Sequence, residues 1–506
     1  MRSPLLPIFL AAACLHAQPQ RAHLRRPFPR PIVDPAILNA ADVDSVVQAA
    51  AASVNSESMV IAVTDRQGDI LAIYQKPAAP ATSTANFGVQ ADTKEVAVAL
   101  ARTAGFFSNN QAPLSSRTVR YISGIHFPPG IAFTGNAALY GIENTNRGCG
   151  FNTNFIPGQE VPPARSIDGS QPGLGILTGK ADLNDSDPNA VNPGGVPLYK
   201  EGAMVGGVGV AGVSPDVAEF AALSGAVGAG FGANPAPPGV VVIDGIAVPF
   251  VNQTTRPSGY DAGTADGTYF LGPLSSPKPA PEGYLVAAQA GSIGGLTQSD
   301  VQQIIANAIA EANQTRAIIR LPIGSRARMV FAVADLDGAL LGLYRMPDAT
   351  FFSIDVAVAK SRNVIFFSGP DRAASDLAGV PMGTAVTNRT IGFGTQPIYP
   401  PGIDASTPGP FFGLYQFDTL HPCTQGSQAP NPNQNGIVFF PGALPLYKNG
   451  VLVGGLGVSG DGVDQDDFVT AAAAAGFEAP INIRADQIID QGVRLPYLKF
   501  PRNPTD

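Results

Sequence analysis

The sequence contains two long segments that each occur twice. Residues 59–77 return as residues 329–347, and residues 193–212 return as residues 441–460. Repeats of this length, so far apart in the chain, are typical of two copies of one domain and not of a solenoid of short units. We therefore expect two copies of one fold, in which functional residues can be sought as matched pairs.

The composition sets the broad class of protein. A chain of 506 residues with 45% hydrophobic residues is long enough for two or three domains with their own cores. Its 57 glycines and 47 prolines predict long loops between the ordered elements. The net charge of -8 argues against nucleic acid or an anionic membrane as the main partner.

The N-terminus reads as an export signal. Arg2 is followed by the apolar run 5–13, and a small residue precedes Gln18, so residues 1–17 fit a cleaved signal peptide. The run is too short to span a bilayer. Lipid attachment at Cys14 is the alternative. We expect a periplasmic or extracellular protein in which residues 18–33, rich in Arg and Pro, form a disordered spacer.

After cleavage only two cysteines remain, Cys149 and Cys423. In an exported protein, two cysteines are compatible with a disulfide, which here would join the two copies. Two unrelated free thiols fit the sequence equally well. Neither cysteine has the spacing to a histidine or another cysteine that a zinc site requires.

Each copy shows the same succession of patterns. The elements expected in copy one and copy two are an amphipathic helix (43–54 and 301–312), a β-hairpin (59–74 and 329–344), a second helix (93–102 and 353–362), a glycine-rich hairpin within the repeats 193–212 and 441–460, and an alanine-rich helix. Asn39 with Asp42 and Thr297 with Asp300 predict capping boxes, and Ser353 is the predicted N-cap of its helix.

The domain boundaries follow from these patterns. Residues 34–257 form the first predicted domain and residues 296–506 the second, with a Gly/Pro/Ser-rich linker at 258–295. Both copies contain long loop-rich stretches, 109–192 and 369–440. Such stretches are too long for simple connections, so they could cover a site.

A Gly-x-Gly-x-x-Gly pattern occurs in both copies. It includes Gly207 and Gly209 in the first copy, and Gly455 and Gly457 in the second. The pattern matches the dinucleotide fingerprint, but these glycines lie inside an apolar run, and no acidic residue ends a second parallel strand further on. We therefore favour a packing role, in which the glycines let another backbone or a flat ligand approach closely.

Evidence for catalysis is weak, and we predict no catalytic residues. The Gly-x-Ser-x-Gly, His-Glu-x-x-His and Cys-x-x-Cys motifs are absent from the sequence. His126 and His421 occupy non-equivalent loops, where exposed histidines without a catalytic role are the simpler interpretation. Copy two also carries four arginines that could bind carboxylates or form a solvated rim: Arg316, Arg320, Arg326 and Arg328.

Taken together, the motifs resemble the GlcG/HbpS family, often described as haem-binding proteins. The resemblance rests on residues 332–338, 344–348, 353–360 and 445–460, and on the pair Gln465-Asp466. Copy two is the better match, because copy one has Ala211 in place of the serine of Val-Ser-Gly and lacks the Gln-Asp pair.

The resemblance implies a fold and a function. The fold would be α/β (α+β): two tandem profilin-like domains, each a mainly antiparallel sheet of about five strands flanked by helices. An internal pseudo-dimer would replace a dimer of single-domain members, and further homo-oligomers are compatible with it.

The leading function hypothesis is haem, or a related flat apolar ligand, bound without catalysis. Candidate cofactor-binding residues are His126, His421, Gly207, Gly209, Gly455 and Gly457. The sequence does not identify which residue would ligate a metal. The alternatives are a structural module that presents loops to a protein partner, and an enzyme acting on a small hydroxy or keto acid.

Overall fold

The computed structural model describes residues 36–85, 90–119, 122, 139–142, 176–178, 192–233, 240–243, 246–396, 399–400, 407–420, 424–429, 431 and 433–505. Residues Ala36–Asp506 belong to one compact unit. The predicted signal peptide and spacer, all three cysteines, His126 and His421 lie outside the described residues.

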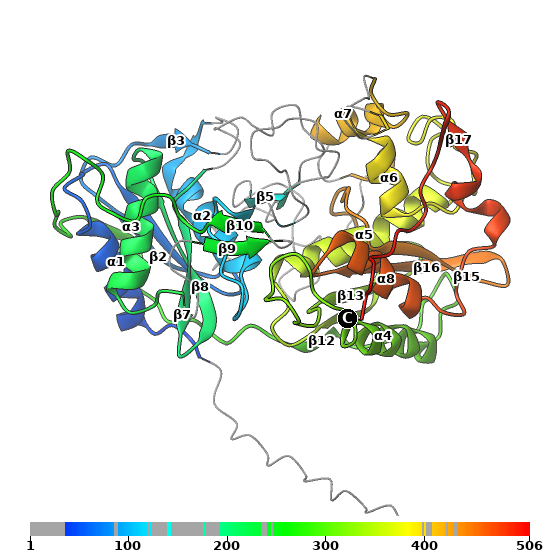
Figure 1. Cartoon of the computed structure of the whole chain (residues 1–506), viewed down its shortest axis with the longest axis horizontal. Helices are drawn as coiled ribbons and strands as arrows, with labels where there is room; N and C mark the ends of the chain where they lie inside the picture. Colours follow the sequence, from blue (N-terminus) through cyan, green and yellow to red (C-terminus); the bar gives the residue numbers. More distant parts are fainter. Residues whose placement is uncertain are drawn as a thin grey trace, which may run out of the picture. The chain divides into compact units, whose positions relative to one another are not determined.

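The first copy is built on a five-stranded antiparallel sheet with strand order β11-β2-β1-β8-β7 (Figure 1). Its elements are α1 (Ala40–Ala51), β1 (Val60–Asp65), β2 (Ile70–Gln75), α2 (Thr93–Phe107), β7 (Gly195–Lys200), β8 (Ala203–Ala211), α3 (Pro215–Gly228) and β11 (Thr268–Leu271).

The second copy repeats this topology, with strand order β12-β14-β13-β16-β15. Its elements are β12 (Gly283–Val286), α4 (Gln298–Ala312), β13 (Val330–Ala334), β14 (Leu340–Arg345), α5 (Phe352–Ser368), β15 (Ala443–Lys448), β16 (Val451–Ser459) and α8 (Val463–Ala473). The pairing register agrees as well, since Val60 lies opposite Ala211 and Val330 opposite Ser459. The predicted fold class is thereby confirmed.

Both faces of each sheet are covered by helices. Alternate residues of β1 separate into two groups: Val60 and Ala62 pack with Val96 of α2, whereas Ile61 and Val63 join the cluster that contains Val46 of α1. This division is the period-two alternation of a strand. In the second copy α5 contacts β13 and β16, and α4 contacts α8. Burial on both faces explains why the strands read as continuous apolar runs.

The predicted linker contributes a strand to each sheet. Strand β11 pairs with β2 at one edge of the first sheet, and β12 pairs with β14 at the corresponding edge of the second. Both strands are only four residues long and half exposed. Pairing with an existing edge stabilises these short segments, which have too few residues for a clear period-two signal.

The remaining elements are short and lie outside the two sheets. They are β3 (Thr82–Thr84), β4 (Gln90–Asp92), β5 (Leu139–Ile142), β6 (Ile176–Thr178), β9 (Val240–Ile243), β10 (Ile246–Pro249), α6 (Asn388–Gly394), α7 (Phe412–Leu420), β17 (Ile489–Asp490) and β18 (Val493–Arg494), with 3-10 turns at Ile481–Ile483 and Ala485–Gln487. No helix among the described residues combines the length and apolarity needed to cross a bilayer.

The helix starts confirm two predicted caps and correct a third. Asn39 with Asp42 and Thr297 with Asp300 form reciprocal capping boxes. Helix α5, however, begins at Phe352, so Ser353 lies in the first turn and not at the N-cap. The Ser353 hydroxyl is buried and lies 2.9 Å from that of Thr350. Tertiary contacts have overridden the local N-cap preference at this position.

Candidate functional site

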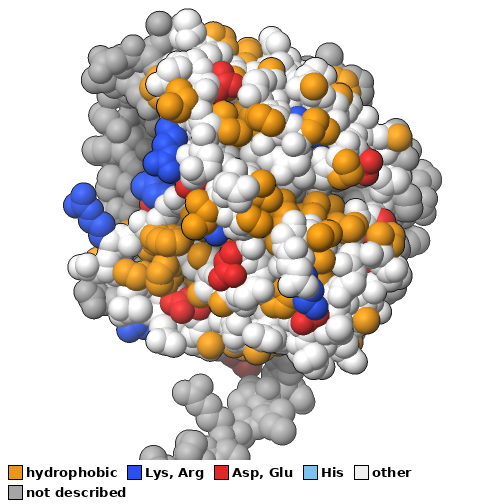
Figure 2. All heavy atoms as spheres, turned by 90° about the vertical axis from the view of Figure 1, so that its right-hand side faces the viewer, with side chains coloured by type: hydrophobic (Ala, Val, Ile, Leu, Met, Phe, Trp, Pro, Cys, Tyr) orange, Lys and Arg blue, Asp and Glu red, His pale blue; other side chains and the backbone are white. Residues whose placement is uncertain are grey.

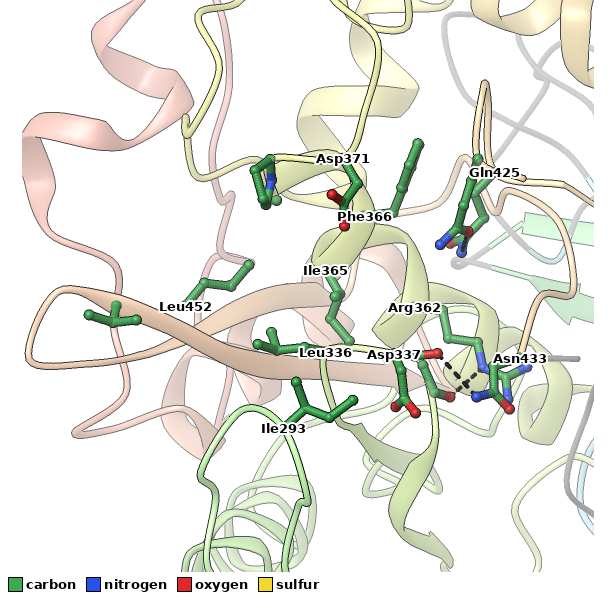
Figure 3. A pocket seen from close by; sticks show the side chains of 15 residues that line it. Ile293, Leu336, Asp337, Arg362, Ile365, Phe366, Asp371, Gln425, Asn433 and Leu452 are labelled. Atoms are coloured by element: carbon green, nitrogen blue, oxygen red, sulfur yellow. Dashed lines mark hydrogen bonds between the residues drawn. The ribbon is translucent and has the colours of Figure 1, made fainter. Parts of the chain in front are cut away.

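A cavity of about 520 Å³ lies in the second copy, where the ends of several elements meet (Figure 3). Its walls come from the β13–β14 turn, the C-terminal half of α5, the segment after α5, the 425–433 loop and the start of β16. The lining residues are Ile293, Leu336, Asp337, Gly338, Arg362, Ile365, Phe366, Gly369, Pro370, Asp371, Gln425, Gln428, Asn433, Val451 and Leu452.

Asp335 fixes one wall of the cavity. Its carboxylate accepts hydrogen bonds from the backbone N–H groups of Ser292 (2.7 Å), Ile293 (3.0 Å) and Gly294 (2.7 Å). Burial alone would raise the pKa of Asp335, but these hydrogen bonds outweigh it and lower the pKa below its ordinary value. The segment before α4 is therefore tied to the β13–β14 turn, which places Ile293 at the cavity.

Arg362 ties the same β13–β14 turn to helix α5. Its side chain is buried, and it donates from Nε to the carbonyl oxygen of Gly338 (2.9 Å) and from Nη1 to Asn435 (3.1 Å). Burial lowers the pKa of Arg362 to about 10, so the guanidinium remains charged at neutral pH. Asn433 also donates to the Asp337 carbonyl (3.1 Å), and these bonds hold the turn against α5.

The lining is apolar on one side and polar at the rim. In Figure 3 Leu336, Ile365, Phe366 and Leu452 lie along α5 and the sheet, with Asp337, Gln425 and Asn433 on the other side. Among the described lining residues there is no His, Cys, Met or Tyr, the side chains that ligate haem iron. The arrangement can hold a flat, mainly apolar molecule, and these residues alone offer its centre no metal ligand.

A second group of polar side chains is buried beneath α8. Lys360 donates to the Val458 carbonyl (2.7 Å) and to Asp466 (2.9 Å), and Arg320 pairs with Asp461 at 2.9 Å. The adjacent cavity measures only about 20 Å³, which is room for one water molecule. The cavity beside this cluster therefore has no space for a substrate.

This buried cluster is not among the residues predicted from the sequence, although the repeat contains a signal for it. Lys360 aligns with Leu100, and Asp466 aligns with Ala218, so both partners are apolar in copy one. A pair that is polar in one copy and apolar at both positions in the other points to a direct contact. Of the four candidate arginines, Arg320 does bind a carboxylate, that of Asp461. Arg316 and Arg326 donate to carbonyls of the C-terminal segment, and Arg320 is buried.

Burial raises the pKa of Asp466 from 3.8 to about 6, against the opposing effect of Lys360. Because this pKa is higher in the folded state, the stability that proton binding contributes is complete below 3.8 and lost as the pH rises through 6. We therefore expect that lowering the pH from 7 to 4 stabilises the wild type relative to Asp466→Asn. Unfolding free energies of both proteins across this range would check it, and parallel pH profiles would contradict it.

The predicted glycines lie against helices and do not line the cavity. A Cβ added at Gly209 would collide with the Ala97 carbonyl of α2, and one at Gly457 with the Ala357 carbonyl of α5. The remaining two glycines meet the same helices in the same way: Gly207 at Ala101 and Gly455 at Ser361. In the described structure it is therefore a helix backbone, not a ligand, that approaches these glycines closely. His126 and His421 lie outside the described residues.

Comparisons with known proteins place the second copy in a family. Residues 296–475 match a family model described as haem degrading protein HbpS-like. An uncharacterised 15.0 kDa protein from the dhaT-dhaS intergenic region of Citrobacter freundii is 30% identical over 169 residues, which is 33% of this chain and 85% of the relative.

Two solved structures are also similar. The PduOC:heme complex is 22% identical in sequence to this chain. The match covers 36% of this chain and 94% of the PduOC chain, with a TM-score of 0.24. HbpS is 21% identical, and the match covers 38% of this chain and 97% of the HbpS chain, with a TM-score of 0.22. The fold assignment rests on the strand order and register described above. From the family model and the Citrobacter relative, the chain belongs to the GlcG/HbpS-like family.

Proposed function

We propose that this chain binds haem or a related flat, mainly apolar ligand in the cavity of its second copy. The observation that carries the proposal is the cavity itself, whose 520 Å³ falls within the range of small-molecule sites. Ile365 and Phe366 are nearly inaccessible to solvent but face the cavity, so they offer a ligand an apolar surface held by α5.

Haem is the first candidate because the matching family model is described by haem degradation. The apolar wall suits a porphyrin, which Phe366, Ile365 and Leu336 would hold. Bound haem would supply an iron that takes nitrogen, oxygen or sulfur ligands. The described lining residues provide no side chain of the usual kind, and His421 precedes Gln425 of the lining by four residues in the sequence.

We also propose where this protein acts and what role its ligand binding has. The N-terminal segment 1–17 supports action outside the cytoplasm, as expected of an exported protein. We propose binding without catalysis, since Leu336, Ile365 and Phe366 give the cavity an apolar wall that can hold a ligand.

Titration with haem and with metal-free protoporphyrin would test the proposal. We expect saturable binding of both, and at least tenfold weaker binding by Ile293→Asp, which places a charge at the apolar wall. The Ile293 side chain is 58% exposed, so this substitution should leave the fold intact. Ile481→Asp is the matched control, since Ile481 is 67% exposed and does not line the cavity.

The iron ligand is tested separately. If His421 ligates the iron, His421→Ala will change the Soret band of the haem complex and leave the binding of metal-free protoporphyrin unchanged. The same comparison applies to His126→Ala. The proposed site is wrong if neither porphyrin binds, or if Ile293→Asp binds both as tightly as the wild type.

A further inference from the structure

The cavity of the second copy has a counterpart in the first. The repeat aligns residues 336–338 with 66–68, and residues 362–371 with 102–111. Because both sheets have the same strand order and register, residues of the aligned strands and helices occupy equivalent positions in the two copies. Helix α5 runs one residue further than α2, and beyond it Pro370 lines the cavity with Leu452, just as Asn110 contacts the aligned Met204. Three cavity residues and their copy-one equivalents are Leu336 and Arg66, Phe366 and Phe106, and Pro370 and Asn110.

In the first copy this position is filled by a loop of the second copy. The loop between β14 and α5 inserts Asp348 and Phe351. The Phe351 ring packs on that of Phe106 with 5.0 Å between centroids. The Asp348 carboxylate accepts hydrogen bonds from Arg66 Nη2 (2.9 Å) and from the backbone N–H of Asn110 (3.1 Å). The first copy thus shows how this position of the fold binds an aromatic ring beside a carboxylate.

The cavity of the second copy keeps the aromatic side chain and lacks both carboxylate partners. Phe366 stands where Phe106 stands, but Leu336 has no charge and Pro370 has no backbone N–H to donate. A ligand carboxylate placed as Asp348 is placed would find neither the cation nor the donor that it needs.

The charges at the rim have changed in the same direction. Asp337 and Asp371, both exposed lining residues, replace Gln67 and Gln111 of the first copy. The one cation in the lining, Arg362, has an equivalent in Arg102 and already bonds to Gly338 and Asn435. Over the aligned positions 336–338 and 362–371, the charged cavity-lining residues Asp337, Arg362 and Asp371 sum to -1, whereas Arg66 and Arg102 give the equivalent positions of the first copy +2.

We propose that the cavity selects a neutral or cationic flat aromatic ligand, whose ring packs on Phe366, and discriminates against a carboxylate at the position equivalent to that of Asp348. This inference rests on the proposed function and specifies its ligand class. It follows that the propionate groups of a porphyrin weaken its binding here, so a porphyrin ester should bind more tightly than the free diacid.

Three naphthalene probes of similar size and different charge would test the inference: 2-naphthylmethylamine, 2-naphthylmethanol and 2-naphthoate. Isothermal titration of the wild type at pH 7 should show the amine binding at least tenfold more tightly than the carboxylate, with the alcohol between them. The double variant Leu336→Arg with Pro370→Asn installs the copy-one residues, and it should reverse the preference. Leu336→Met with Pro370→Ala is the matched control and should retain it.

Each outcome bears on a different claim. Naphthoate binding as tight as that of the amine, with porphyrin binding intact, would overturn the inference and leave the proposed function standing. An unchanged preference in the Arg/Asn variant would equally overturn it. If neither the naphthalenes nor the porphyrins bind, the proposed function fails as well.

Discussion

Replacing Lys360 by Met is expected to lower the free energy of unfolding by about 3–5 kcal/mol, the usual cost of removing one partner of a buried ion pair. Lys360 is 1% exposed and donates to Asp466 at 2.9 Å. Without the ammonium group, the carboxylate of Asp466 would be buried with no counter-charge at that position. Its second oxygen, Oδ1, already has no hydrogen-bond partner. Urea unfolding followed by far-UV circular dichroism would measure the loss.

The first copy supplies the control for this experiment. There Leu100 and Ala218 stand at the positions of Lys360 and Asp466, and the equivalent helix α2 packs on the equivalent sheet. The double variant Lys360→Leu with Asp466→Ala should therefore recover most of the lost stability, because no charge remains buried. If the double variant is as unstable as the single one, the loss comes from packing and not from the unpaired carboxylate.

The repeat and the local patterns predict most of the fold. The hairpins at 59–74 and 329–344 and both capping boxes follow from short-range rules, and the structure contains them at these positions. Strands β11 and β12 do not follow from such rules. Each exists because an edge strand offers hydrogen bonds, and that edge is set by residues almost two hundred positions away for β11.

The candidate site is less predictable, for the same reason. The cavity is lined by separate segments that lie between Ile293 and Leu452 in the sequence. No local sequence motif predicts that these segments come together. Lys360 and Asp466 are 106 positions apart in the chain. The two copies within the sequence can, however, be compared with each other position by position. Positions where one copy is polar and the other apolar identify both the buried pair and the altered cavity.

Helix α5 lies so close to β16 that the glycines of this strand leave no room for a side chain. A Cβ at Gly457 would lie 2.7 Å from the backbone nitrogen of Ser361 and even closer to the carbonyl oxygen of Ala357. Both obstacles are backbone atoms, so a rotamer change cannot relieve the clash. The helix must instead move away from the sheet, and the contacts between α5 and β16 would loosen along their length.

Gly457→Ala is therefore expected to lower the free energy of unfolding by about 3 kcal/mol, the upper end of the usual cost of overpacking. Gly413→Ala is the matched control, because Gly413 lies in α7, and an added Cβ there meets nothing within 4 Å. That variant should be at least as stable as the wild type, because alanine has the higher helix propensity. Urea unfolding of both variants and the wild type would measure these differences in the free energy of unfolding. A Gly457→Ala protein as stable as the wild type would show that α5 can shift on the sheet at little cost.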